Sequence, residues 1–253
     1  MTPLHLTIIT GSSRGLGEAL VDALIAPGQR VLGIARHVNA RLQQRAAAAA
    51  ADLTQWPADL AEALPVAQRL RDWLAAHDAA RIASVTLINN AGVTGVPAPA
   101  AQLPLEDLVR SVRVGLEATM LLSAAFLGAT ADWPMPRRLV NVSSGLGRRA
   151  IAGSAAYCAA KAGMDNFSRA LALEEASRPN PARIESIAPG IIDTDMQASL
   201  RAADAAAFPE RERFVQFHAQ GMLSTPADCA QRLLAWLARA DFGAETLTAL
   251  PVK

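Results

Sequence analysis

Short apolar runs alternate with longer amphipathic stretches from one end of the chain to the other. Runs with the length of buried strands lie at 4–10, 30–35, 84–89, 138–142 and 183–188, and a weaker one lies at 246–250. Helical periodicity is found over 15–26, 59–76, 105–130, 154–177 and 226–239. Repeated βα units of this kind fold as a parallel sheet with helices on both faces. With a third strand expected just before residue 52, the pattern predicts one doubly wound α/β domain over residues 1–253 with a seven-stranded parallel sheet.

The stretch 193–225 has no obvious place in this alternation. In an open α/β sheet, an insertion after the carboxyl end of a strand often covers the ligand crevice. Two interpretations stay open: its apolar side chains face a hydrophobic substrate as a lid, or they simply pack the segment onto the domain. These side chains are Met196, Leu200, Phe208, Phe214, Phe217 and Met222.

Composition narrows the classes of partner. The 24 basic and 23 acidic side chains give a formal net charge of +1, so the charge favours neither nucleic acid nor an anionic membrane surface. Apolar runs are shorter than the roughly 18–20 residues that cross a bilayer, and the beginning of the chain does not resemble a secretion signal. Two cysteines cannot build a disulfide framework, so a cytoplasmic protein is expected. The four histidines are scattered, and no metal site is predicted.

The first strand runs directly into a glycine-rich turn, Thr10-Gly11-Ser12-Ser13-Arg14-Gly15-Leu16-Gly17. Glycines allow a tight bend and a close approach of the backbone to a pyrophosphate, and the following helix offers free N–H groups and a positive dipole end. A strand-to-helix turn also needs glycine for purely structural reasons. The position straight after the first strand favours a dinucleotide site.

Two arginines suggest which dinucleotide is bound. The second strand ends at Ala35-Arg36, where an acidic residue would accept hydrogen bonds from a ribose 2′-hydroxyl. Arg36 and Arg14 could instead flank a 2′-phosphate with forked donors, which favours NADP over NAD. The alternative is a pair of solvated surface arginines.

The chain contains a single tyrosine, Tyr157, and a single internal lysine, Lys161. Their i, i+4 spacing puts both on one face of the predicted helix. A nearby cation favours the phenolate and lowers the pKa of the phenol, which makes it a useful proton donor to a carbonyl. Ser144, at the end of the fifth strand, could polarise the same substrate oxygen.

Taken in order, these motifs resemble those of the short-chain dehydrogenase/reductase family along nearly the whole chain. Within the family, 154–165 and 188–197 are most similar to the branch of sepiapterin and benzil reductases. The motifs are the loop at 10–17, Asp52-Leu53 after the third strand, Asn89-Asn90-Ala91-Gly92 after the fourth, Ser144, Tyr157-x3-Lys161, and Pro189-Gly190 after the sixth.

The resemblance implies a Rossmann fold and a role for each motif. Tyr157 would be the general acid of carbonyl reduction, Lys161 would bind the nicotinamide ribose, and Ser144 would orient the substrate carbonyl. Asp52 and Leu53 would meet the adenine. The implied NADP(H)-binding residues are Gly11, Ser13, Arg14, Gly15, Leu16, Gly17, Arg36, Asp52, Leu53, Asn90, Ala91, Gly92, Tyr157, Lys161, Pro189, Gly190, Ile192 and Thr194, with the last two holding the carboxamide.

One position departs from the family pattern: Gly115 replaces an asparagine that completes a proton relay to the lysine. The expected function is NADPH-dependent reduction of a ketone or diketone, with an apolar or aromatic substrate and solvent taking over the relay. The alternatives are an NADP-binding regulatory protein with weakened catalysis, and a reductase of 3-ketoacyl substrates. The resemblance also implies a homodimer or homotetramer that packs through the helices at 105–130 and 154–177.

Overall fold

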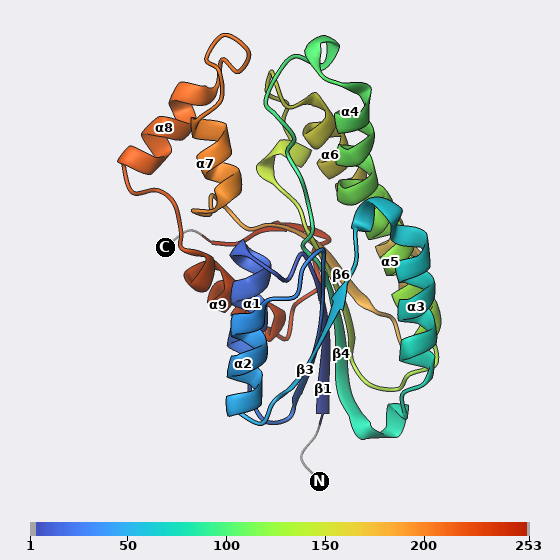
Figure 1. Cartoon of the computed structure of the whole chain (residues 1–253). Coiled ribbons are helices and arrows are strands. Elements are labelled where there is room, and N and C mark those ends of the chain that lie inside the picture. Colours follow the sequence, from blue (N-terminus) through green and yellow to red (C-terminus); the bar gives the residue numbers. More distant parts are fainter. Residues whose placement is uncertain (1–3, 252–253) are drawn as a thin grey trace.

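Seven parallel strands form one sheet in the computed structural model, which describes residues 4–251 (Figure 1). The strand order is β3-β2-β1-β4-β5-β6-β7, so the direction of strand addition reverses between β1 and β4. This reversal opens a crevice at the carboxyl ends of the strands. The strands are β1 (Leu4–Thr10), β2 (Gln29–Ala35), β3 (Asp52–Pro57), β4 (Ile82–Asn89), β5 (Arg137–Val142), β6 (Arg183–Ala188) and β7 (Leu247–Ala249).

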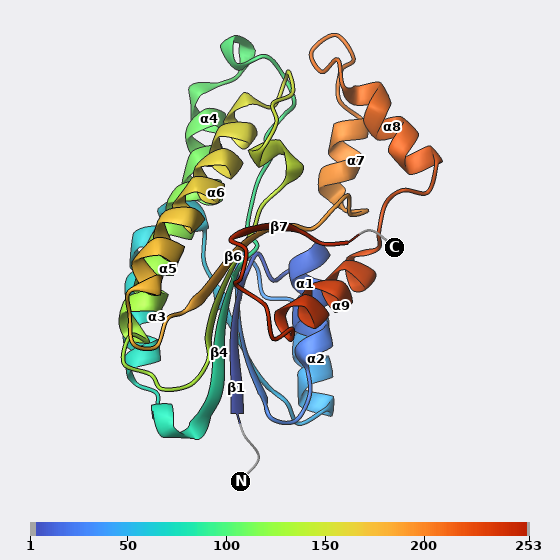
Figure 2. The ribbon, with the colours of Figure 1, turned by 180° about the vertical axis from the view of Figure 1, so that it is seen from behind.

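Helices cover both faces of the sheet. One layer contains α1, α2 and α9, and the other contains α3, α4, α5 and α6; α7 and α8 stand above the carboxyl edge (Figures 1 and 2). The helices are α1 (Gly15–Leu24), α2 (Ala40–Ala48), α3 (Ala63–Ala75), α4 (Leu105–Val112), α5 (Ala118–Ala129), α6 (Ala155–Ala176), α7 (Asp195–Arg201), α8 (Arg211–Ala219) and α9 (Pro226–Leu237).

Two apolar cores lie on the two faces of the sheet. Along β1, Leu6 and Ile8 enter the core shared with α3 and α5, whereas Ile9 enters the core shared with α1 and α9. Successive side chains of a strand point to opposite faces, and a parallel strand covered on both sides is apolar at nearly every position. This explains why the central strands appear in the sequence as continuous apolar runs.

The doubly wound α/β fold with seven parallel strands confirms the predicted class. The third strand was placed wrongly. Asp52 and Leu53 do not follow β3 but begin it, and the Asp52 carboxylate pairs with Arg30 at the start of β2, at a distance of 2.6 Å. Because β3 is an edge strand in which only Trp56 is buried, it lacks the apolar run by which the other strands are found.

The predicted helix at 105–130 is a long apolar segment, interrupted by a π-helical turn over Arg113–Glu117. Within residues 4–251, Leu105–Ala129 is the one helical stretch long and apolar enough to cross a bilayer on length and composition. Its inner side, which includes Leu122 and Phe126, belongs to the core shared with α3. A core helix of a globular domain has this same composition.

Candidate active site

A cleft of about 880 Å³ lies at the carboxyl ends of the strands, beneath α7 and α8. It brings together most of the residues that the sequence singled out, from both halves of the chain. Those that line it are Gly11, Ser13, Arg14, Gly15, Leu16, Arg36, Asn90, Ala91, Gly92, Ser144, Tyr157, Lys161, Pro189, Gly190, Ile192 and Thr194. Gly17 lies just behind the lining, and Asp52 and Leu53 lie at the opposite end of the sheet.

The glycine-rich turn after β1 is closely packed. A Cβ on Gly17 would lie 2.1 Å from the carbonyl oxygen of Gly11, and Gly11 itself has a φ of +68°. The Thr10 hydroxyl accepts the N–H groups of Asn90 and Ala91, each at 3.0 Å, and so joins this turn to the loop after β4. The result is a fixed backbone cradle in front of the N-terminus of α1, of the kind that fits a pyrophosphate.

The carboxyl end of β3 brings a different aspartate into the cleft. Asp59 and Leu60 line it, seven residues after the pair that we expected there. The Asp59 carboxylate accepts the N–H of Ala61, which lowers the pKa of Asp59, and Arg110 at 3.2 Å lowers it further. The sequence contains Asp-Leu three times, at 52, 59 and 107, and only the pair at 59 directly follows the strand that contains the buried Trp56. Asp59-Leu60 therefore replaces Asp52-Leu53 as the pair beside the dinucleotide cradle.

Arg36 and Arg14 both line the cleft, but they differ in their partners. Arg36 forms no ion pair within residues 4–251. The Arg14 guanidinium lies 2.9 Å from the carboxylate of Asp195, at the beginning of α7, and both side chains are largely exposed. Arg14 therefore links the glycine turn to the helices above the cleft.

Tyr157 and Lys161 lie on the same face of α6, as their spacing predicts. The Lys161 ammonium is 5.7 Å from the centre of the Tyr157 ring and donates a hydrogen bond to the Val142 carbonyl at 2.7 Å. Ser144 follows the same strand, β5, and its hydroxyl accepts the N–H of Leu146 at 3.1 Å. The end of β5 and the first turns of α6 thus bring a phenol, an ammonium group and a hydroxyl to one place.

Burial controls the acid–base properties of this group. Lys161 is only 4% exposed, and burial lowers its pKa from 10.5 to about 8, although the carboxylate of Asp165 acts in the opposite direction. Burial raises the pKa of Tyr157, and the Ser144 hydroxyl partly offsets this rise. The lowered phenol pKa that the sequence suggested is thus not found in the structure, because burial of the phenol has the larger effect.

Gly115 lies in the π-helical turn, against α6. A Cβ at this position would come within 3.1 Å of the Ala160 side chain, a contact tighter than most. The missing side chain therefore allows the π-helical turn to pack closely against α6, the helix that carries Lys161. The π-helical turn forms here although glycine replaces the asparagine of the family pattern.

The segment over 193–225 forms two short helices with an apolar cluster of their own. Leu200, Phe208 and Phe214 are buried together, with Phe217 packed against them. Leu200, Phe214 and Phe217 also line the cleft, whereas Phe208 is completely buried behind them. Part of the set therefore packs the segment onto itself, and part lines the cleft. Met222 does neither, since half of its surface is exposed.

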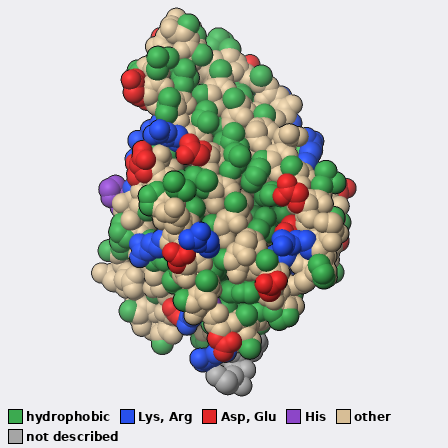
Figure 3. Space-filling model, turned by 90° about the vertical axis from the view of Figure 1, so that its right-hand side faces the viewer, with side chains coloured by type: hydrophobic (Ala, Val, Ile, Leu, Met, Phe, Trp, Pro, Cys, Tyr) green, Lys and Arg blue, Asp and Glu red, His purple; other side chains and the backbone are tan. Residues whose placement is uncertain are grey.

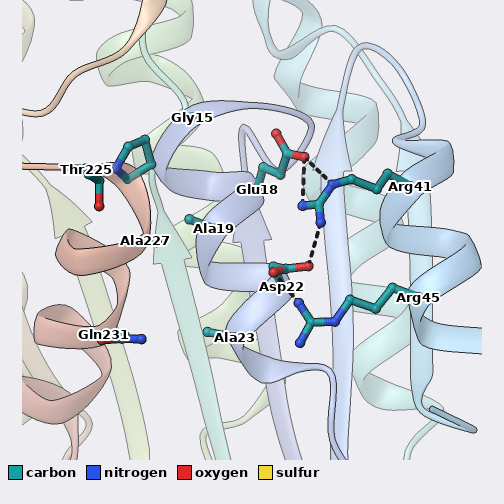
Figure 4. Close-up of a pocket in the computed structure, with 11 residues that line it drawn as sticks. Gly15, Glu18, Ala19, Asp22, Ala23, Arg41, Arg45, Thr225, Ala227 and Gln231 are labelled. Carbon is teal, nitrogen blue, oxygen red and sulfur yellow. Dashed lines mark hydrogen bonds and ion pairs between the residues drawn. The ribbon is translucent and has the colours of Figure 1, made fainter. Parts of the chain in front are cut away.

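A second depression, of about 500 Å³, lies between α1, α2 and α9 (Figure 4). Its charged groups are matched within the protein: Arg41 contacts both Glu18 and Asp22, and Arg45 contacts Asp22. These pairs fasten α2 to α1 and leave no arginine or carboxylate of this depression without a partner among the described residues.

Comparison with known proteins decides the family. The sequence model described as short chain dehydrogenase matches residues 5–205. The chain belongs to the short-chain dehydrogenase family. Its members are oxidoreductases. The cleft described above lies where the strand order reverses, the place at which open α/β sheets bind their ligands.

Individual relatives of this short-chain dehydrogenase agree with the expected branch. It is 30% identical over 239 residues to the (S)-benzoin-forming benzil reductase of Bacillus cereus, covering 94% of this chain and 96% of the relative. It is 32% identical over 251 residues to the sepiapterin reductase of Rattus norvegicus, covering 93% and 92%. A metagenomic short-chain oxidoreductase solved in complex with NADP has a TM-score of 0.74 and 25% identity, covering 99% and 97%.

Proposed function

We propose that this protein is an NADPH-dependent reductase of ketones or diketones, with Tyr157 as the general acid. The observation that carries the proposal is the placement of Ser144, Tyr157 and Lys161 in one cleft with the glycine cradle. A bound nicotinamide cofactor supplies the hydride, and the protein has to supply position and a proton.

Each of the three side chains has a state suited to its task. Tyr157 is protonated at neutral pH, since the ordinary pKa of a phenol is about 10 and burial raises it here, so it holds a proton for the more basic alkoxide oxygen of the substrate. Lys161, whose pKa is about 8, is a cation at neutral pH and offers donors to the ribose hydroxyls. The Ser144 hydroxyl can donate to the carbonyl oxygen while it accepts the Leu146 N–H.

The preference for NADP rests on the charges at the adenosine end of the cleft. Arg36 follows β2 and forms no ion pair within the described residues, although its charge helps to lower the pKa of the nearby Asp59 carboxyl, and a 2′-phosphate would match this charge. The relative solved with NADP supports the same cofactor. Ile192 and Thr194 line the same cleft, and the methyl group of Thr194 approaches Gly15; we assign to these two residues the binding of the carboxamide.

An apolar or aromatic substrate agrees with the benzil reductase relatives and with Phe214 and Phe217 in the cleft lining.

A homo-oligomer agrees with the exposed apolar residues Leu105, Val109 and Val112 of α4, Met120 of α5 and Leu173 of α6. Apolar side chains are frequent on the face that α3, α4 and α5 present (Figure 3).

The test is NADPH oxidation with benzil, a pterin ketone and a 3-ketoacyl thioester, for the wild type and Tyr157→Phe. We expect the wild type to reduce benzil, and the variant to lose about 10²–10⁴-fold in kcat, the usual contribution of a general acid. NADPH binding followed by fluorescence should be retained in the variant. Binding without turnover of any carbonyl by the wild type would favour the regulatory alternative, and equal rates in the variant would exclude Tyr157 as the acid.

A further inference from the structure

The acidic side chains that line the cleft all have an arginine partner. Glu18 pairs with Arg41 at 2.9 Å and Asp195 pairs with Arg14 at 2.9 Å. The remaining two are paired more loosely, Asp59 with Arg110 at 3.2 Å and Asp193 with Arg201 at 3.8 Å. The carboxylates of the cleft are therefore neutralised within the protein.

The arginines of the cleft are not all matched in this way. Arg213 is engaged twice, by Glu210 at 3.4 Å and by the ring of Phe217, whose centre is 5.4 Å from the guanidinium. Arg36 and Arg149 line the cleft but form no ion pair within residues 4–251. These two guanidinium groups are left for an anionic ligand.

The two arginines belong to different parts of the cleft. Arg36 follows β2, beside the glycine turn, where the proposed 2′-phosphate accounts for it. Arg149 comes five residues after Ser144, in a turn that its own N–H closes on the Gly145 carbonyl at 3.2 Å. Arg149 is therefore on the loop that carries the carbonyl-orienting serine, where the cofactor phosphates do not explain its charge.

The neighbouring Arg148 shows that charge on this loop can be purely structural. Its guanidinium donates to the Thr248 carbonyl at 2.8 Å and lies 3.7 Å from the buried carboxylate of Asp165. Arg148 fastens the loop to β7 and α6 and does not line the cleft. Arg149, next to it, lines the cleft and has no such partner among the described residues.

We infer that the substrate of this reductase is a carbonyl compound with an apolar body and a carboxylate, and that Arg149 binds the carboxylate. The inference rests on the proposed function and specifies its substrate class. Phe214 and Phe217 offer a surface for the apolar body, Ser144 and Tyr157 hold the carbonyl, and the forked donors of Arg149 match a carboxylate. Because Arg149 is exposed, its attraction is weakened by salt.

The experiment compares aryl keto acids with their methyl esters, which have the same carbonyl without the charge. Suitable pairs are benzoylformate, 3-benzoylpropionate and 4-carboxybenzil, each beside its ester, because they place the carboxylate at increasing distances from the carbonyl. For the best pair we expect kcat/KM of the acid to exceed that of the ester by about tenfold, the effect of one charge-assisted hydrogen bond. The ratio should fall when NaCl is added.

Variants then assign the preference to one side chain. Arg149→Gln should bring the acid-to-ester ratio close to one, and Arg149→Glu should reverse it. The control is Arg71→Gln, an exposed arginine on α3 that pairs only with its neighbour Asp72 and should leave the ratio unchanged. The ester rate of each protein is its own reference for an intact active site.

The outcomes separate the inference from the function on which it rests. Equal rates for acids and esters in the wild type, or a preference that survives Arg149→Gln, would overturn the inference and leave carbonyl reduction standing. A preference for a coenzyme A thioester over every keto acid would also overturn it, since the anion would then be a carrier phosphate. If the wild type reduces none of the acids and none of the esters, the proposed function itself is wrong.

Discussion

The two walls of the cleft are built in different ways. The lower wall consists of the strand ends, the glycine turn and α6. Its buried polar groups Thr10 and Lys161 are joined by hydrogen bonds to Asn90 and to Val142. The upper wall, α7 and α8, has its own small core around Phe208. Ile151, from the loop before α6, packs against this core. The exposed pair of Arg14 and Asp195 is a second link to the rest, and a short bridge between Ile192 and Ser224 joins the two ends of the segment.

This difference separates the chemistry from the selection of ligands. A wall that shares the main cores of the domain can open only at a cost close to global unfolding, so it holds the proton donor and its partners in fixed positions. A wall with a separate core can move or change its lining without disturbing the sheet. The proposed catalytic residues lie on the first wall, and the aromatic lining lies on the second.

The largest effect should come from breaking the lower wall at Gly17. In Gly17→Ala the added methyl would lie 2.1 Å from the Gly11 carbonyl oxygen, so the turn must open. We expect a loss of more than about 2 kcal/mol in unfolding free energy, as for an overpacked core, and NADPH binding weakened beyond detection. Chemical denaturation and NADPH fluorescence measure the two effects.

The control for this change is Gly128→Ala in α5, where nothing lies within 4 Å of the added methyl. A helical alanine in place of an exposed glycine should stabilise the protein by up to about 1 kcal/mol and leave NADPH binding intact. If Gly17→Ala bound NADPH as tightly as Gly128→Ala does, the tight turn would not be a requirement of the site.

A smaller effect should come from neutralising Lys161 with pH. Its pKa is about 8, so the cation present at neutral pH is lost as the pH rises through 8, while Tyr157 stays protonated because burial raises its pKa. The kcat/KM for reduction should fall by up to about tenfold per pH unit above 8. Lys161→Arg, whose charge persists over this range, should give a lower but flat profile.

Lys161 also predicts a pH dependence of stability, which runs opposite to that of the rate. Because its pKa is 10.5 in the unfolded chain and about 8 in the folded one, the unfolded state binds more protons between these values. Its contribution to the free energy of unfolding should therefore rise with pH over that interval.

A wild-type rate that stays constant up to pH 10 would mean that the charge of Lys161 does not matter to turnover.

The lower wall could be predicted from the sequence almost completely, because its residues follow strands that are visible as apolar runs. The exception is Asp59-Leu60. This pair follows β3, an edge strand that has no continuous apolar run. The upper wall could be predicted only as an insertion with apolar side chains over the crevice, and its helices and ion pairs could not. Helix α8 buries only Phe214, so its periodicity is weak, and Asp195 is separated from Arg14 by 181 residues.

The smallest effect should come from releasing Arg14 from the upper wall. In Asp195→Asn the ion pair is lost, and since Arg14 and Asp195 are 67% and 75% exposed it contributes at most about 1 kcal/mol. Stability should hardly change. If Arg14 binds the 2′-phosphate together with Arg36, as the sequence suggests, the freed guanidinium should tighten NADPH binding by up to about fivefold and leave NADH binding unchanged. Asp72→Asn, which breaks the exposed pair with Arg71, is the matched control. Equal changes for both cofactors would show that Arg14 does not bind the 2′-phosphate and only pairs with Asp195. Weaker NADPH binding would show that this ion pair holds the cleft in the conformation that binds the cofactor.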